Sequence, residues 1–185
     1  AGGALDAVVS DGGGAGRGGR ARSSCGGGGG VRQRAWATAL AEARAGKNVV
    51  TANKKLLAEQ GEEIFALAND GKAALGFDAA VGGGIPCIAA LKSGLVGNRV
   101  MSVMGILNGT TNYILTRMQE ESLSFEAALA DAQARGFAEA DPTFDIEGYD
   151  AGHKIAILSM IAFNQKIDYK AISIEGITKI GAFDI

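Results

Sequence analysis

The feature that most constrains this chain is an acidic segment, residues 139–150, that leads into an apolar segment at residues 155–162. The second segment is apolar on every side at helical spacing, which is typical of a buried helix. Asp150 and Lys154 stand four residues apart at the start of this helix and therefore share one face. On an exposed helix such a pair contributes only about 0.3–0.5 kcal/mol. On a buried helix the pair is partly desolvated, and a lysine in such a place exchanges protons readily.

Composition and charge argue against several classes of protein. The 185 residues carry a formal net charge of −2, which gives no reason to expect binding to nucleic acid or to an anionic membrane. No apolar run reaches the roughly 18 residues of a transmembrane helix and no signal segment opens the chain, so we expect a soluble, cytoplasmic protein. Cys25 and Cys87 form no disulfide framework, which fits a reducing compartment. His153 is the single histidine, so neither a His/Cys metal site nor a Ser-His-Asp triad is indicated, and we interpret it as a helix-face residue.

Residues 1–35 form a glycine-rich segment for which we expect poorly defined backbone. A G-x-G-x-x-G pattern covers residues 14–19, but this pattern indicates dinucleotide binding only between a strand and a helix, and here more glycine follows. Residues 5–9 are compatible with one short strand. The arginines between residues 17 and 22 resemble an RNA-binding Gly/Arg tail, although no aromatic side chain is present to stack on a base.

Hydrophobic patterning predicts helices and strands after the glycine-rich segment. The predicted helices cover residues 35–45, 61–69 and 125–135, and the predicted strands cover residues 48–52, 74–81, 100–107 and 172–177. Lys54 follows the first of these strands at its carboxyl end, which is where ligands bind in open α/β sheets. A solvated turn from strand to helix is the alternative interpretation of Lys54.

Two further turns lead from a strand into a helix. The glycines of GGGIP at residues 82–86 allow close approach of the backbone and expose its carbonyls and amides to a ligand or an ion, unless they only make a tight turn. In NGTTN at residues 108–112, the free amides at Gly109 and Thr110 suit a carboxylate. Thr110 is equally suited to cap the helix that begins near Tyr113.

Four blocks of this sequence resemble homoserine dehydrogenases in order and spacing. They are VVTANK at 49–54, AVGGGIP at 80–86, GILNGTTNY at 105–113, and the segment 136–154 with GF, EADP, GYD and a lysine four residues beyond the last aspartate. The resemblance runs from residue 38 to residue 185. Before residue 38 it fails, so the N-terminal sequence is either divergent or altered, for example by a shifted reading frame.

The resemblance implies an α/β fold followed by an α+β fold. Residues 1–35 would be the poorly defined segment and residues 36–70 the remnant of a Rossmann-type nucleotide-binding domain. Residues 71–185 would be an α+β catalytic and dimerisation domain, incomplete at its C-terminus, in which a mixed sheet of residues 74–81, 100–107 and 172–177 pairs with that of a second copy. The expected assembly is a homodimer.

The implied activity is the NAD(P)-dependent interconversion of L-homoserine and L-aspartate 4-semialdehyde, a step in the biosynthesis of threonine, methionine and isoleucine. In the family's pattern Lys154 would be the acid/base, Asp150 would orient it, and Lys54 would polarise the same substrate oxygen. The residues that would bind the substrate are Glu139, Asp145, Gly109, Thr110 and Phe137. Phe137 stands where the family often has tyrosine, so a hydroxyl contact is lost there.

The resemblance also implies a cofactor site and an ion site. Cofactor contacts would fall on Asn53, Lys54, Gly83 and Glu139, while the choice between NADP and NAD is not readable. A monovalent cation would be held by Asp78, Val81, Gly83 and Ile85, and Asp78 replaces the usual glutamate. Two alternatives stay open: a truncated, non-catalytic dimerisation module of such an enzyme, and an RNA-associated protein acting through its Gly/Arg tail.

Overall fold

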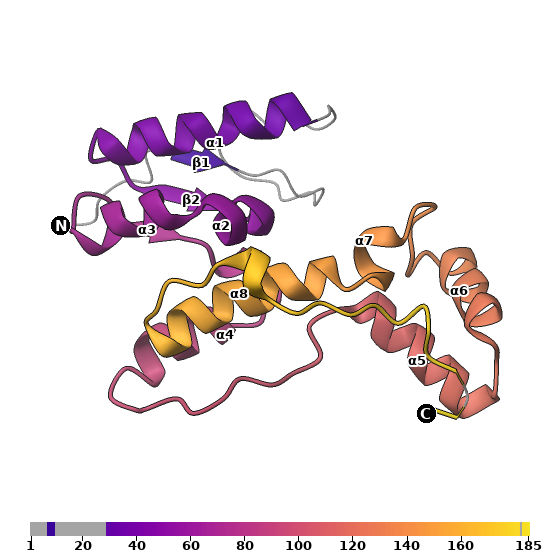
Figure 1. Ribbon diagram of the computed structural model, residues 1–185. Coiled ribbons are helices and arrows are strands. Elements are labelled where there is room, and N and C mark those ends of the chain that lie inside the picture. The colour runs from indigo at the N-terminus through magenta and orange to yellow at the C-terminus, as the bar shows by residue number, and fades with distance from the viewer. Residues whose placement is uncertain (1–6, 10–28, 182) are drawn as a thin grey trace.

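The computed structural model of the chain describes residues 7–9, 29–181 and 183–185 (Figure 1). The N-terminal helices and strands form a layer along one side of the long helix α8. A group of helices that includes α5, α6 and α7 lies at the N-terminal end of α8 (Figure 1). The glycine pattern at residues 14–19, the arginines between 17 and 22, and Cys25 lie outside the described residues.

The N-terminal layer contains a small parallel sheet. Its strands β1 (Ala7–Val9), β2 (Val49–Thr51) and β3 (Leu75–Gly76) lie in the order β1-β2-β3, with Val49 beside Ala7 on one side and beside Leu75 on the other. Parallel neighbours need a long connection between them, and helices usually provide it. Here α1 (Gly29–Arg44) precedes β2, and α2 (Lys54–Gln60) and α3 (Glu62–Asn69) connect β2 to β3. The predicted α/β character of this part is confirmed.

The second group of helices has its own small core. The helices α5 (Gly109–Glu121) and α6 (Phe125–Ala134) pack against each other through Ile114, Met118 and Ala128, which are buried. The side chain of Asn108 accepts the backbone N–H of Thr111 and so caps the start of α5. The short helix α7 (Thr143–Ile146) then leads into α8 (Tyr149–Phe163).

Helix α8 is the predicted helix of the apolar segment, and it joins the two parts of the chain. Ala156, Ile157 and Leu158 are buried in one hydrophobic core with Leu57 of α2 and Ile64 of α3. Short helical segments pack around this core. Three of them follow β3, namely η1 (Asp78–Ala80), α4 (Cys87–Ala89) and η2 (Ala90–Gly94), and η3 (Tyr169–Ala171) follows α8. The first turns of α8 therefore sit where the N-terminal layer meets the second group of helices.

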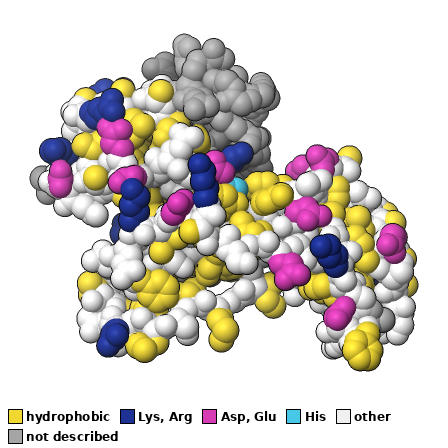
Figure 2. Space-filling view, viewed as in Figure 1, with side chains coloured by type: hydrophobic (Ala, Val, Ile, Leu, Met, Phe, Trp, Pro, Cys, Tyr) yellow, Lys and Arg dark blue, Asp and Glu magenta, His cyan; other side chains and the backbone are white. Residues whose placement is uncertain are grey.

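The predicted mixed sheet is not formed in the described residues. Only Leu75–Gly76 of the segment 74–81 is a strand, and η1 follows it. Residues 100–107 and 172–177 form no strand. A strand is stable only when neighbours satisfy its backbone hydrogen bonds. The segment 100–107 instead leaves Met101, Met104 and Ile106 at least three-quarters exposed. Its backbone runs below α8 in the orientation of Figure 1, and Figure 2 shows exposed hydrophobic side chains on the lower part of the same face.

No helix in the part of the chain that the structure describes is both long and apolar enough to span a membrane.

Candidate active site

Two lysines from distant parts of the chain meet at one buried carboxylate. Asp150 is 4% exposed, and its Oδ2 lies 2.5 Å from Nζ of Lys154, one turn further along α8. Its Oδ1 lies 2.9 Å from Nζ of Lys54, the first residue of α2. The predicted pair on one face of α8 is therefore present, and Lys54 completes a cluster of two ammonium groups around one carboxylate.

The end of β2 places Lys54 in this cluster. Thr51 is the last residue of β2, and its hydroxyl oxygen accepts the backbone N–H of Asn53 at 3.1 Å. The side-chain oxygen of Asn53 in turn accepts the N–H of Leu56 at 3.2 Å and caps α2. The chain therefore turns sharply at the carboxyl end of the parallel strand, and Lys54 starts the new helix beside α8.

Asn108 connects the cluster to the neighbouring helices, which sequence analysis did not foresee. Its Nδ2 donates to Oδ2 of Asp150 at 2.9 Å and to Oδ1 of Asp145 at 2.7 Å, and its Oδ1 accepts the N–H of Thr111 at 2.8 Å. An asparagine before a helix is an ordinary cap in sequence, so only its position within the GILNGTTNY block could have pointed to this role. Asn108 thereby fixes Asp150 relative to α5 and brings in Asp145.

A backbone carbonyl holds Lys154 from a second direction. Its Nζ donates to the carbonyl oxygen of Leu107 at 2.6 Å, in addition to Asp150. The side chain of Lys154 is 18% exposed, compared with 32% for Lys54. An ammonium group held by two fixed acceptors, with limited access to water, can present its remaining hydrogen to one bound oxygen atom.

The environment of Asp150 favours its ionised form. Burial alone would raise the pKa of this carboxyl group, but hydrogen bonds from Lys154, Asn108 and Lys54 outweigh the effect of burial and hold the pKa below its usual range. Asp150 is therefore a permanent negative charge between the lysines near neutral pH.

The residues predicted to bind substrate lie around the start of α5 and the loop before α7. The Oγ1 of Thr110 donates to the carbonyl oxygen of Phe137 at 2.7 Å, which ties the start of α5 to this loop. The ring of Phe137 stacks on Tyr113 with centroids 4.5 Å apart. Gly109 and Glu139 are exposed, and the space where a side chain at Gly109 would project is open.

The predicted ion site is a separate turn between β3 and α4. Gly82 and Gly83 adopt positive φ angles of 77° and 60°, which only glycine tolerates easily. The carbonyl oxygens of Val81 and Ile85 already accept hydrogen bonds from the thiol and the N–H of Cys87, at 3.3 and 2.8 Å. Within the described ranges, no group of three or more His, Cys, Asp or Glu side chains is arranged to hold a metal ion.

The buried amide group of Asn53 lies beside Lys54, just beyond the end of β2. The side chain of Asn53 is almost fully buried, and its Nδ2 has no hydrogen-bond partner in the described structure. Buried amide groups are normally satisfied, so this N–H points to a missing acceptor at the carboxyl end of β2. The position fits the predicted cofactor contacts at Asn53 and Lys54, because ligands of parallel sheets bind at this end.

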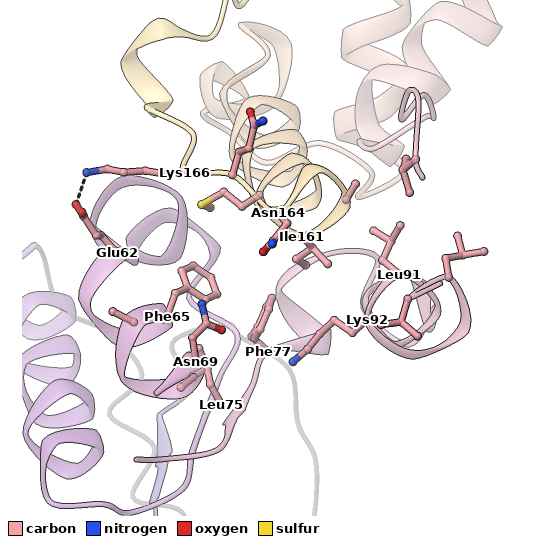
Figure 3. A pocket seen from close by; sticks show the side chains of 18 of the residues that line it. Glu62, Phe65, Asn69, Leu75, Phe77, Leu91, Lys92, Ile161, Asn164 and Lys166 are labelled. Atoms are coloured by element: carbon pink, nitrogen blue, oxygen red, sulfur yellow. Dashed lines mark ion pairs between the residues drawn. The ribbon is translucent and has the colours of Figure 1, made fainter. Parts of the chain in front are cut away.

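A cavity of about 890 Å³ is separate from this cluster (Figure 3). It lies between α3, η2 and the C-terminal end of α8, and it is lined by Phe65, Leu91 and Ile161 among others. An ion pair of 2.6 Å between Glu62 and Lys166, both 68% exposed, spans its rim. None of the predicted site residues lines this cavity.

Comparisons with known proteins point to one family. A family model described as homoserine dehydrogenase matches residues 86–185. The homoserine dehydrogenase of Neisseria gonorrhoeae is 56% identical over 140 residues, which are 76% of this chain and 32% of that protein. The chain thus spans about a third of the length of the curated relatives it matches.

Solved structures give the same result. A crystal structure of a homoserine dehydrogenase from Thiobacillus denitrificans superposes with a TM-score of 0.77 at 47% identity, covering 81% of this chain and 35% of that one. A hyperthermophilic archaeal homoserine dehydrogenase in complex with NADPH superposes with a TM-score of 0.73 at 29% identity, covering 80% of this chain and 46% of that one. The matched family model covers more than half of the sequence, and the chain therefore belongs to the homoserine dehydrogenase family.

Proposed function

We propose that the protein is a homoserine dehydrogenase that interconverts L-homoserine and L-aspartate 4-semialdehyde with NADP or NAD, as part of threonine, methionine and isoleucine biosynthesis in the cytoplasm. The observation that carries the proposal is the convergence of Lys54 and Lys154 on the buried Asp150. Family membership supports it, as does the relative whose structure contains NADPH.

The proposal assigns proton transfer to Lys154. During reduction of the semialdehyde its ammonium group donates a proton to the substrate oxygen, and during oxidation of homoserine its neutral amine accepts the hydroxyl proton. Asp150 and the carbonyl oxygen of Leu107 keep Nζ in place for both directions. Lys54 polarises the same oxygen from α2. A nicotinamide cofactor, when bound, supplies the hydride acceptor or donor.

The proposed substrate site lies next to the lysines. The carboxylates of Glu139 and Asp145 are suited to the amino group of homoserine, since an ammonium group pairs best with ionised acceptors. The free amides at Gly109 and Thr110, at the start of α5, are suited to the substrate's carboxylate. The ring of Phe137, which stacks on Tyr113 of α5, is the remaining proposed substrate contact.

Replacing Glu139 by alanine is expected to raise the KM for homoserine about tenfold or more, because an exposed loop carboxylate is lost from the substrate's ammonium group. The kcat should change much less, since Glu139 has no proposed part in proton transfer. Initial rates at varied homoserine measure both constants. The matched control is Glu120→Ala on the exposed face of α5; a KM that is equal in the two variants would refute the assignment of Glu139.

Cofactor binding is proposed at the carboxyl end of β2 and at the glycine turn. Asn53 and Lys54 lie at the end of β2 and the start of α2, the space beside Gly83 in the glycine turn is open, and Glu139 is an exposed residue of the loop before α7. The test measures homoserine-dependent reduction of NADP, and then of NAD. The protein to be used is the natural polypeptide that contains this sequence, called the full-length enzyme below. Reduction that needs homoserine supports the proposal, and a folded protein without it contradicts it.

A monovalent cation is proposed for the glycine turn. The carbonyl oxygens of Val81, Gly83 and Ile85 and the carboxylate of Asp78 are hard oxygen donors of the type such ions bind. Two of these carbonyls keep one lone pair each beside their hydrogen bond to Cys87.

Assembly as a homodimer is proposed through the segment 100–107. Its backbone is not paired in a sheet and its apolar side chains are exposed, with Met104 at 92%. We expect this segment to pair with the same segment of a second copy. A module that only dimerises, without catalysis, is the second candidate function, and the exposed apolar side chains of this segment favour it.

The substitution Met104→Lys is expected to shift the protein from dimer to monomer, because it puts a charge into an interface formed by apolar side chains. Sedimentation velocity at several concentrations measures the shift. Lys92→Ala, a change on the exposed surface of η2, is the control. Dimers of equal stability in both variants would place the interface elsewhere.

A further inference from the structure

The histidine next to the proposed acid/base is buried and paired across the two parts of the chain. His153 directly precedes Lys154 on α8, and its side chain is 2% exposed. Its Nε2 lies 2.9 Å from Oε1 of Glu59, a residue 94 positions earlier in the sequence. Glu59 belongs to α2, the helix that begins at Lys54. The pair therefore connects the two helices that supply the two lysines.

Aromatic rings hold the imidazole of His153 in one orientation. It stacks on Tyr169, with ring centroids 4.3 Å apart and planes 9° apart, and on Phe144 at 5.4 Å and 21°. Nζ of Lys54 lies 5.7 Å from the centroid of the Phe144 ring, within the range of a cation–π interaction. The stacked rings thus connect η3, α8 and α7, and the cation–π contact adds Lys54, the first residue of α2.

The contacts of the ring favour one placement of its hydrogen. An ionised carboxylate only accepts hydrogen bonds, so the Nε2 of His153 carries the hydrogen that Glu59 accepts. The other ring nitrogen, Nδ1, is buried and has no hydrogen-bond partner among the described residues. A hydrogen on Nδ1 would be a buried donor without an acceptor, which is unfavourable. A hydrogen on Nε2 alone therefore satisfies the contact with Glu59 and leaves no buried donor without an acceptor.

We propose that the pair of His153 and Glu59, with the rings of Phe144 and Tyr169, is a positioning device that fixes the rotation of α8 against α2 and so holds Lys154 opposite Lys54. Successive helix residues point about 100° apart, so anchoring His153 also fixes the direction in which Lys154 projects. Glu59 is on the same helix as Lys54, so a single contact sets both lysines. The kinetic part of this inference rests on the proposed function; the pairing itself does not.

A second ion pair provides a control that separates an effect on the position of Lys154 from a general effect on the stability of the fold. Glu62 of α3 pairs with Lys166, which follows α8, at 2.6 Å. This pair also connects the N-terminal layer to the end of α8, but both side chains are 68% exposed, compared with 2% and 30% for His153 and Glu59. Exposed pairs contribute little, so Glu62→Ala serves as the matched control.

The pairing is tested by NMR on the untagged chain, in which His153 is the only histidine. Long-range ¹H–¹⁵N correlation spectra are expected to show Nε2 protonated and Nδ1 unprotonated, with one set of signals. In Glu59→Ala these signals should move towards the average of the two tautomers, whereas in Glu62→Ala they should stay. A wild-type ring that already averages between tautomers would overturn the proposal.

The positioning role is tested by kinetics of the full-length enzyme. His153→Phe keeps a ring for the stack but removes the hydrogen-bond donor, and Glu59→Ala removes the acceptor. Each change is expected to lower kcat about tenfold with KM values for homoserine and cofactor within about twofold, since alignment and not binding is affected. The double variant should be no worse than the poorer single one, and His153→Gln, which retains a donor, should recover part of the rate.

The kinetic results distinguish a failure of the positioning role from a failure of the proposed function. Full kcat in His153→Phe or in Glu59→Ala, or losses that multiply in the double variant, would overturn the positioning role. Losses of equal size in Glu62→Ala would also overturn it, because any contact between the two parts would then have the same effect. A wild-type enzyme that fails to oxidise homoserine would refute the proposed function instead, while the NMR spectra would still decide whether the pair exists.

Discussion

Replacing Lys154 by alanine is expected to lower kcat for homoserine oxidation by about 10²–10⁴-fold, the usual contribution of a positioned acid/base. The fold should persist, because the side chain is on the partly accessible side of α8 and Ala156, Ile157 and Leu158 anchor that helix in the core. Initial rates of nicotinamide reduction give kcat, and circular dichroism spectra with thermal unfolding check the fold.

The variant Lys154→Arg separates charge from proton exchange at the same position. An arginine keeps the positive charge beside Asp150, but its guanidinium does not deprotonate in proteins. Both variants should therefore be severely impaired. A rate close to that of the wild type in Lys154→Ala would end the assignment of Lys154 as the acid/base, and recovery in Lys154→Arg would show that only the charge matters.

Replacing Asp150 by asparagine is expected to impair both turnover and stability. Asparagine has the same shape, but Lys54 and Lys154 would face each other without the carboxylate between them. Removing one partner of a buried ion pair typically costs about 3–5 kcal/mol, and the partial exposure of both lysines reduces the expected loss here to about 1–3 kcal/mol. Denaturant unfolding at neutral pH measures this loss, and kcat should fall by about 10²-fold or more, as misplacing a catalytic group does.

The pH dependence of stability gives Asp150→Asn a second signature. The pKa of Asp150 is lower in the folded state than in the unfolded state, where it is about 3.9. The folded state therefore binds fewer protons, so the contribution of Asp150 to stability is fully present above the unfolded-state pKa and is lost as the pH falls through the folded-state pKa. The difference in unfolding free energy between wild type and Asp150→Asn should shrink as the pH is lowered below about 4.

Two outcomes would contradict this account of Asp150. Equal unfolding free energies for wild type and variant at neutral pH would mean that the charge is not paired as the structure shows. A difference that stays constant down to low pH would mean that the variant changes packing and not ionisation. Asp70→Asn is the control, since Asp70 is exposed and lies outside the cluster, in a surface pair with the exposed Lys72.

The sequence allowed the centre of the candidate site to be predicted because the main signal, the spacing of two charged residues, is local. The spacing of Asp150 and Lys154, followed by apolar residues at helical spacing, predicted one face of a buried helix, and α8 confirms it. Lys54 is far away in the sequence, but its place after a buried strand put it at the ligand-binding end of the sheet. The structure brings it to 2.9 Å from Asp150.

The parts that were missed depend on contacts between distant segments. Asn108 has the sequence pattern of a helix cap, and it is one, but the same side chain also joins two aspartates that lie 37 and 42 residues further along the chain. His153 belongs to the helix as expected, yet its burial depends on Glu59 and Tyr169, which no local pattern links to it. The segment 100–107 has the pattern of a strand, but pattern alone does not supply the neighbour that a strand needs.

The most direct test of the central claim is a crystal structure of the full-length enzyme with homoserine and a nicotinamide cofactor bound. The account predicts that the hydroxyl oxygen of homoserine lies within hydrogen-bond distance, about 2.7–3.2 Å, of Nζ of Lys154. The amino group of homoserine should face Glu139 and Asp145. A homoserine whose hydroxyl group contacts neither Lys154 nor Lys54, or one bound in the cavity beside Phe65 and Ile161, would contradict the account.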